Sequence, residues 1–328
     1  MGLTDGTVLG ATKLVHHGSD QKRWTLVLVA EGYQATEMAK FQTDAQSFVT
    51  KLFATPPFDT FQAAINVYRL DVASTDSGAD DPVACSGTGA APATFFDASF
   101  CSSGDIPTPV RRLLRVNEAN VLATVRDHVP HWDMIMVVVN STVYGGFGGD
   151  IAVFSTAAHA MDIGIHEMGH TAFGLADEYP YWAGCGVDVD HDHHPATEPS
   201  APNVTLDSNR ATIKWRDLVL ASTPMPTTSN INCTACDPQP NPLPATTVGA
   251  YEGAHTYHCG AFRPQFNCRM RVLDAPFCAV CRREIAQRLA QHLPRKKPKK
   301  PRTRPRKPRT PRVGMKKPKR RSRRGGHR

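Results

Sequence analysis

The sequence GIHEMGHTAFGLADEY, residues 164–179, constrains this chain more than any other feature. From Ala157 onward the chain is rich in helix-forming residues and lacks proline, so we expect a helix despite its glycines. At 3.6 residues per turn, His166 and His170 lie one above the other on one face, where both can reach one metal ion. The carboxylate of Glu167 can meet a water on that ion. This H-E-x-x-H spacing predicts a catalytic zinc ion with Glu167 as general base; the alternative is a core helix with two satisfied histidines.

A third ligand has to follow the helix, because a catalytic zinc ion keeps three protein ligands and one open position for water. Gly174 permits a sharp turn, since glycine adopts positive φ without steric cost. Asp177 and Glu178 come directly after that turn. The metzincin pattern has a ligand three residues after the glycine, and Asp177 has this spacing, although the glycine itself is shifted by one. We therefore expect Asp177 as the third ligand, with Glu178 as the alternative.

Six blocks of sequence extend the pattern well beyond the helix. They are LVAEGY (28–33), PPFDTFQAAINVYRLDVASTDSGADDP (56–82), FFDASFC (95–101), VVNSTVYGGFGG (138–149), HEMGHTAFGLADEY (166–179) and CRMRVLDAPFCAVC (268–281). Together they resemble the IgA-peptidase family of zinc metallopeptidases. The resemblance implies a metal-dependent endopeptidase that acts on protein or peptide substrates, with His166 and His170 as ligands and Glu167 as catalytic base. It does not identify the substrate.

Residues 1–179 are expected to form an α/β subdomain with a mixed, partly parallel sheet. Aliphatic and β-branched runs predict strands at 24–30, 66–72, 133–139 and 151–155. Helices are predicted at 36–53 and 118–129, with the zinc helix after the fourth strand. The glycine-rich segment 144–149 is either the rim of a cleft, where an edge strand pairs with an extended peptide, or a plain hairpin turn.

Residues 180–294 are expected to form a lower subdomain dominated by loops, because residues 180–265 are rich in Pro, Thr, Asn and Cys. A helix at 278–293 closes it. Met270 is the candidate for a Met-turn beneath the zinc ion, as in metzincins, and a plain core methionine is the alternative. The segment DVDHDHHP, residues 188–195, offers a second metal site, although exposed Asp-His clusters are more often surface loops.

Nine cysteines favour disulfide bonds and a location outside the reducing cytosol. Cys85 and Cys101 are spaced to close one local loop, and the other seven fall in the lower subdomain. The C-x-x-C units at 233 and 278 are too far apart for a zinc ribbon, so disulfides are the preferred interpretation, with one thiol left over. The N-terminal sequence lacks the pattern of a signal peptide, and no apolar run approaches the about 18 residues of a transmembrane segment.

The charge of the chain is divided unevenly between body and tail. Residues 295–328 hold 19 of the 38 Lys and Arg residues and no Asp or Glu, so the body carries 19 basic and 30 acidic residues, a balance of −11. The prolines and repelling charges of this tail predict disorder. Its function is either attachment to a polyanion, such as nucleic acid, an acidic polysaccharide or an anionic surface, or a solubilising arm.

The sequence therefore predicts a monomeric enzyme with one zinc ion, held by His166, His170 and Asp177, that hydrolyses peptide bonds with Glu167 as base. Tyr251 and Tyr257 are the candidates for a donor to the oxyanion, and the sequence does not rank them. A protein that binds polyanions through its tail, with an inactive peptidase body, is the alternative. The intact Glu167 argues against it.

Overall fold

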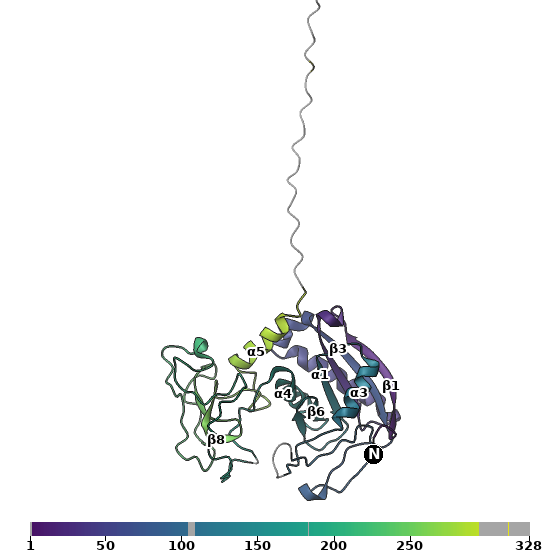
Figure 1. The fold of residues 1–328 in the computed structure, drawn as a ribbon, viewed down its shortest axis with the longest axis horizontal. Coiled ribbons are helices and arrows are strands. Elements are labelled where there is room, and N and C mark those ends of the chain that lie inside the picture. Colours follow the sequence, from purple (N-terminus) through teal and green to yellow (C-terminus); the bar gives the residue numbers. More distant parts are fainter. Residues whose placement is uncertain (1, 104–108, 183, 295–313, 315–328) are drawn as a thin grey trace, which may run out of the picture. The chain divides into compact units, whose positions relative to one another are not determined.

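A mixed six-stranded sheet organises the first half of the chain, in the strand order β1-β3-β2-β4-β6-β5 (Figure 1). The computed structural model describes residues 2–103, 109–182, 184–294 and 314. β2, β3, β4 and β6 run parallel, and β1 and β5 are antiparallel strands at the two edges. The strands are β1 Gly6–Val15, β2 Trp24–Glu31, β3 Ile65–Ser74, β4 Met134–Val139, β5 Gly146–Gly148 and β6 Ala152–Ser155.

The described residues also form five α-helices and five short 3-10 helices. The α-helices are α1 Met38–Ala54, α2 Phe58–Phe61, α3 Glu118–His128, α4 Ala160–Phe173 and α5 Ala279–Ala290. The 3-10 helices are η1 Asp20–Lys22, η2 Ala35–Glu37, η3 Gln62–Ala64, η4 Val83–Cys85 and η5 Arg216–Leu218. None of the helices in the described part of the chain combines the length and apolar character that crossing a bilayer requires.

The central strands are apolar because helices cover both faces of the sheet. Every residue of β2 and β4 is buried, as expected for parallel strands inside an α/β fold. The crossover from β2 to β3 carries α1, and the crossover from β3 to β4 runs the opposite way across the sheet with α3. Since such connections are right-handed, α1 and α3 cover opposite faces.

α4 packs on the same face as α1, and small residues bring it close to the sheet. Phe48 of α1 and Phe154 of β6 lie with ring centroids 5.4 Å apart. A methyl group at Gly164 of α4 would lie 2.7 Å from the ring of Phe48, so glycine is needed for this close approach. The face of α4 that carries the histidines is thereby fixed relative to β5 and β6.

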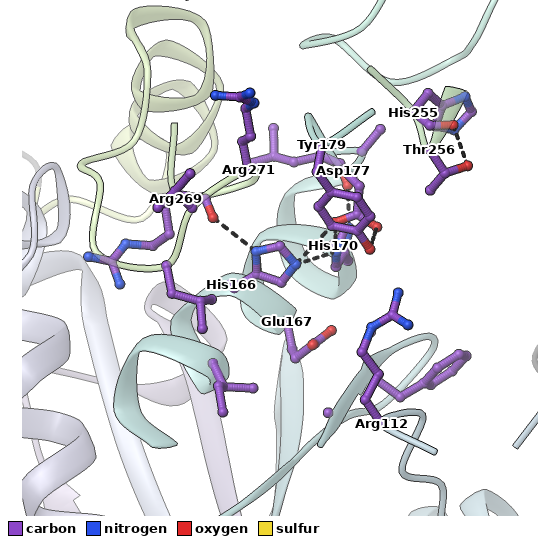
Figure 2. A pocket seen from close by; sticks show the side chains of 18 of the residues that line it. Arg112, His166, Glu167, His170, Asp177, Tyr179, His255, Thr256, Arg269 and Arg271 are labelled. Atoms are coloured by element: carbon purple, nitrogen blue, oxygen red, sulfur yellow. Dashed lines mark hydrogen bonds and ion pairs between the residues drawn. The ribbon is translucent and has the colours of Figure 1, made fainter. Parts of the chain in front are cut away.

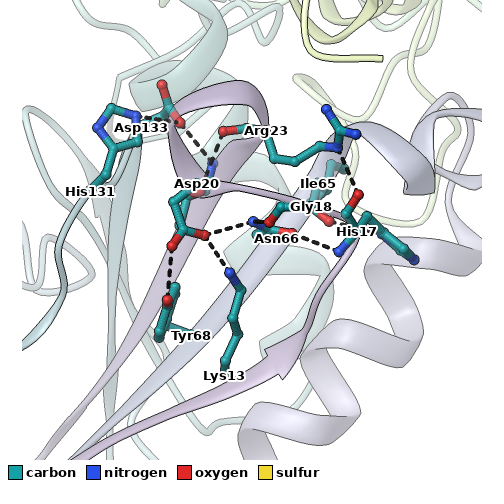
Figure 3. Close-up of polar contacts among 11 residues, drawn as sticks. Lys13, His17, Gly18, Asp20, Arg23, Ile65, Asn66, Tyr68, His131 and Asp133 are labelled. Atoms are coloured by element: carbon teal, nitrogen blue, oxygen red, sulfur yellow. Dashed lines mark hydrogen bonds and ion pairs between the residues drawn. The ribbon is translucent and has the colours of Figure 1, made fainter. Parts of the chain in front are cut away.

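A polar network fixes the start of the sheet at the ends of β1, β2 and β3 (Figure 3). The carboxylate of Asp20 accepts hydrogen bonds from Lys13 at 2.5 Å, Asn66 at 2.7 Å and Tyr68 at 3.0 Å. Asp133, just before β4, accepts a hydrogen bond from the backbone N–H of Thr25 at 2.7 Å. These contacts set the register of the strands at the edge remote from α4.

Residues 180–265 form loops, with one two-stranded sheet of β7 Tyr251–Ala254 and β8 Tyr257–Arg263. Disulfides cross-link this region between Cys185 and Cys236 and between Cys233 and Cys259. A third disulfide joins Cys85 and Cys101 in the long loop after β3, as the sequence suggested. The expectation of one leftover thiol is wrong, because three cysteines in the described residues are free: Cys268, Cys278 and Cys281.

The predicted fold class is confirmed: each of the four predicted strands and four predicted helices is present, with boundaries shifted by a few residues. The chain divides into two units at Pro294, and the predicted subdomain boundary at Tyr179 inside the first unit stays a prediction. The predicted basic tail lies outside the described residues apart from Gly314. The sequence analysis missed β1, β5, β7 and β8 as strands.

Candidate metal centre

α4 carries the H-E-x-x-H sequence and ends as its glycine predicts. Gly174 adopts a φ of +62°, and its N–H caps the last turn by donating to the carbonyl oxygens of Gly169 and His170. The left-handed turn at Gly174 directs the following residues back toward the helix. Asp177 therefore returns to the face of α4 that carries His166 and His170 (Figure 2).

Three side-chain atoms converge on one point beside α4. The Nε2 atoms of His166 and His170 are 3.1 Å apart, and Oδ1 of Asp177 lies 3.1 Å from the first and 3.2 Å from the second. Ligand atoms about 2.05 Å from a tetrahedral zinc ion are about 3.3 Å apart, so the observed spacing matches one shared ion. These three side chains form one of the groups able to hold a metal ion among the described residues.

The hydrogen bonds of the two rings leave lone pairs pointing at this shared point. Nδ1 of His166 contacts the carbonyl oxygen of Arg269 at 3.0 Å, and Nδ1 of His170 contacts that of Leu175 at 2.7 Å. Because a carbonyl only accepts, each neutral ring carries its proton on Nδ1 and has no proton on Nε2. Oδ1 of Asp177, although near both rings, accordingly has no hydrogen-bond donor. Buried acceptors that converge without a donor are what a bound cation satisfies.

The electrostatics of these three side chains also favour a bound cation. Burial alone would lower the pKa of His170, but the charge of Asp177 outweighs burial and raises that pKa to about 9. Burial alone would raise the pKa of Asp177, but the neighbouring His170 holds it well below its usual range. The carboxylate therefore stays ionised and attracts a positive charge, either a proton on the rings or a metal ion.

Glu167 lies between α4 and the edge strand β5, where only glycines leave room for it. A methyl group at Gly146 would lie 2.7 Å from Oε1 of Glu167, and one at Gly148 would lie 2.6 Å from Cβ of His170. β5 therefore packs directly against the face of α4 that carries the site. Burial raises the pKa of Glu167 above its ordinary value, although the neighbouring His166 opposes this shift.

A cavity with a volume of about 1140 Å³ opens over the three convergent side chains. β5, the segment before it and the loops after α4 line this cavity, and Arg112 and Tyr144 face it from the side of β5. Figure 2 shows the carboxylate of Glu167 turned toward the same side as Arg112. Tyr179 donates a hydrogen bond to Oδ2 of Asp177 at 2.7 Å, which orients that carboxylate.

Met270 packs beneath α4, as a Met-turn would require. A methyl group at Gly169, between the two histidines, would lie 2.7 Å from the sulfur of Met270. The neighbouring Arg269 is anchored to α4 by an ion pair with Asp162 at 2.5 Å, while its carbonyl oxygen faces His166. The turn thus supports the side chain of His166, and the Met-turn assignment stays a prediction.

The other residues that the sequence suggested for the site do not all reach the cavity. Glu178 points away from the histidines and is fully buried beneath α4 with the three free cysteines. Tyr257 lines the cavity, whereas Tyr251 is fully buried and donates to the carbonyl oxygen of Thr247 at 3.2 Å. Among the described residues, no group of three or more Asp and His side chains in the segment 188–195 has metal-ligand spacing. The one group that includes a residue of this segment, His193, also contains Cys233 and Cys259, which are joined in a disulfide.

Sequence reasoning did not identify Arg112, Tyr144 and Tyr179 as residues of the site. Tyr144 and Tyr179 lie inside the blocks that carry the family resemblance, so those blocks were the available signal. Arg112 follows no motif, and only the folded chain brings it to the cavity through the loop before α3.

Comparison with known protein families defines the class of this chain, the peptide hydrolases. The sequence model of the IgA Peptidase M64 family matches residues 12–234 and 240–289 of the chain. The chain belongs to this family of metallopeptidases, and the predicted family is confirmed. No individual curated protein matches the chain.

Proposed function

We propose that this protein is a zinc-dependent endopeptidase whose ion is held by His166, His170 and Asp177. The observation that carries the proposal is the convergence of Nε2, Nε2 and Oδ1 within 3.1–3.2 Å of one another, with both Nδ1 protons committed to backbone carbonyls. Two nitrogens and one oxygen are ligands that zinc accepts in catalytic sites, and this set leaves a fourth position open.

Zinc bound there supplies a Lewis acid that polarises the scissile carbonyl and acidifies a water molecule. The residues of the chain perform the proton transfers. Glu167 accepts the proton of the attacking water and delivers it to the leaving amine, so the same carboxyl group acts first as base and then as acid. Its raised pKa favours the first transfer, because a more basic carboxylate accepts a proton from the attacking water more readily.

The side of the cavity formed by β5 receives the substrate in this proposal. β5 is the edge strand of the sheet, and its glycines lie against α4 beside the site. An extended peptide laid along this edge passes Glu167 and the three ligands. Arg112, Tyr144 and Tyr257 line the same cavity and are the candidates to stabilise the oxyanion.

Metal analysis combined with digestion tests this function. The purified chain is incubated with casein and with a peptide library, before and after removal of metal by a chelator. We expect internal peptide bonds to be cleaved by the untreated protein, cleavage to stop after chelation, and stoichiometric zinc to restore it. Cleavage that survives complete removal of metal would refute the proposal.

Binding of a polyanion by the basic tail remains a separate proposal that rests on charge. Residues 295–328 carry 19 Lys and Arg residues and no acidic residue, which favours salt-sensitive attachment to phosphates or sulfates. Since no ligand or base of the site lies in this tail, its removal should leave hydrolysis of a neutral peptide unchanged. Heparin affinity should fall in the same variant.

A further inference from the structure

The three free cysteines lie together with Glu178, the residue that follows Asp177 in the sequence. Cys268, Cys278 and Cys281 are fully buried and converge with the carboxylate of Glu178, so that one ligand atom from each lies within 4.8 Å of the others. Oε1 of Glu178 is 3.3 Å from Sγ of Cys281 and 3.5 Å from Sγ of Cys278. Sγ of Cys268 is 3.7 Å from Sγ of Cys281.

These distances fit a tetrahedral zinc ion. With zinc–sulfur bonds of about 2.3 Å and a zinc–oxygen bond of about 2.05 Å, two sulfurs are roughly 3.8 Å apart and a sulfur and an oxygen roughly 3.6 Å apart. A disulfide would require two of the sulfurs to be about 2.05 Å apart. The other six cysteines form three disulfides, so these three are set apart by the fold itself.

Glu178 provides a second observation that points to a ligand. Its Oε1 accepts a hydrogen bond from Asn203 at 2.9 Å, while its Oε2 is buried and has no hydrogen-bond partner. A carboxylate oxygen without a partner in an apolar interior is costly, because it has lost its hydration shell. A cation bound by Oε1 among the sulfurs would neutralise this carboxylate and offset the cost.

The backbone around the cluster is arranged to support thiolate ligands. Cys278 is the N-cap of α5, and Cys281 follows in the first turn, where the helix favours negative charge. Sγ of Cys278 accepts from the N–H of Cys281 at 3.4 Å, and Sγ of Cys268 accepts from the N–H of Cys278 at 3.2 Å. Such N–H donors orient the sulfurs of metal-binding cysteines.

We propose that Cys268, Cys278, Cys281 and Glu178 bind a second zinc ion with a structural function. Four protein ligands close the coordination sphere, which leaves no position for water or substrate. Three thiolates with one carboxylate also form a softer ligand set than the two imidazoles and one carboxylate of the catalytic centre.

This second ion ties together three segments, two of which adjoin side chains of the candidate metal centre. Glu178 directly follows Asp177, and its N–H donates to the carbonyl oxygen of Met270 at 2.7 Å. Cys268 directly precedes Arg269, whose carbonyl oxygen orients His166. The structural ion therefore positions both the third ligand and the support of the first histidine. Loss of such outer support weakens metal binding by about 10- to 100-fold at comparable sites.

The test is the zinc content and the sulfur coordination of the full chain. Unreduced wild-type protein should hold two zinc ions, and His166→Ala/His170→Ala should hold one. X-ray absorption of that variant should show sulfur neighbours at about 2.3 Å. If the variant does not fold, X-ray absorption is measured on the wild-type protein instead. There we expect three sulfur ligands for every two zinc ions. The proposal is overturned by a folded variant free of zinc, or by peptide mapping that finds a disulfide among the three cysteines.

Two control variants separate this proposal from the proposed function. Cys278→Ser/Cys281→Ser should lose the sulfur-bound ion, and the catalytic site should then need 10- to 100-fold more free zinc for half occupancy. Cys85→Ser/Cys101→Ser removes a disulfide elsewhere and should keep both ions. Sulfur-bound zinc in a wild-type protein that cleaves no peptide would refute the proposed function and support the structural ion.

Discussion

The sheet with its helices and the loop-rich segment 180–265 are stabilised in different ways. In the sheet, every residue of β2 and β4 is buried, and α1 and α4 cover these strands with apolar side chains. Among the described residues of the segment 180–265, the regular elements are β7, β8 and one short 3-10 helix, and two disulfides cross-link the segment. Apolar burial dominates in the first region, whereas in the second two disulfides supplement a smaller set of buried apolar residues.

The difference explains where the side chains of the candidate metal centre come from. α4 belongs to the sheet region and supplies His166, Glu167 and His170 on one rigid element. The residues that complete or support the site, among them Asp177 and Arg269, come from segments outside regular structure. A rigid element gives the centre its geometry, and irregular segments on either side of residues 180–265 bring Asp177 and Arg269 to it.

Removing the disulfide with the longest sequence separation should give the largest difference in stability between the sheet region and residues 180–265. Cys185→Ser/Cys236→Ser releases a link across a sequence separation of 51 residues, for which loop closure predicts a loss of about 4 kcal/mol in the free energy of unfolding. Denaturant unfolding measures the loss. We also expect faster amide exchange in 180–265 and unchanged exchange in β2 and β4.

The matched control for this variant is Cys85→Ser/Cys101→Ser. Its sequence separation is 16 residues, so the expected loss is about 3 kcal/mol. Equal loss of amide protection in β4 and in 180–265 after removal of the 185–236 link would show that the two regions do not differ as described.

A buried carboxylate at the end of β2 should make the sheet region sensitive to pH. Glu31 is fully buried and accepts hydrogen bonds from the N–H groups of Phe96 and Ala98, and burial raises its pKa to about 7. Since folding raises the pKa of Glu31, this residue contributes its full stabilisation below the pKa of 4.5 that it has in the unfolded chain. The stabilisation is lost as the pH rises through about 7.

Glu31→Gln isolates this effect. The free energy of unfolding of the variant minus that of wild type should rise by about 3 kcal/mol from pH 4.5 to pH 8, because the carboxyl group of the wild type loses its stabilisation over this range. One pKa unit corresponds to 1.36 kcal/mol. Denaturant titrations of both proteins at each pH measure the difference. A constant difference across this window would mean that Glu31 does not titrate there.

A smaller effect is expected where β5 meets α4. In Gly148→Ala the new methyl group would lie 2.6 Å from Cβ of His170, so β5 and the ligand have to separate. We expect kcat/KM to fall about tenfold or more, about 1.4 kcal/mol in the barrier, with little loss of stability. Gly186→Ala, where nothing lies within 4 Å, is the control. Equal activity in both variants would exclude tight packing at β5.

The sequence was most informative where local spacing determines geometry. His166 and His170 share a helix face because of their spacing, and Gly174 ends the helix with a φ of +62° as its residue type suggests. The central strands were predicted because parallel strands buried on both faces are continuous apolar runs. β1 was missed because this exposed edge strand lacks such a run.

Long-range relations could not be predicted from the sequence. Among seven cysteines in one region, pairing depends on which loops meet, so the separation of Cys268, Cys278 and Cys281 from the disulfides required the fold. Neither of the C-x-x-C units forms an internal disulfide. Arg112 reaches the cavity through a loop without a motif. The burial of Tyr251 likewise depends on tertiary contacts.

The most direct test of the central claim is Glu167→Gln, measured for zinc content and for turnover of one peptide substrate in the same preparation. The substitution removes the base but none of the three proposed ligands. We expect zinc content to equal that of wild type and kcat to fall by about 10²- to 10⁴-fold, the usual contribution of general acid–base catalysis. Wild-type turnover in a zinc-loaded Glu167→Gln protein would contradict the account.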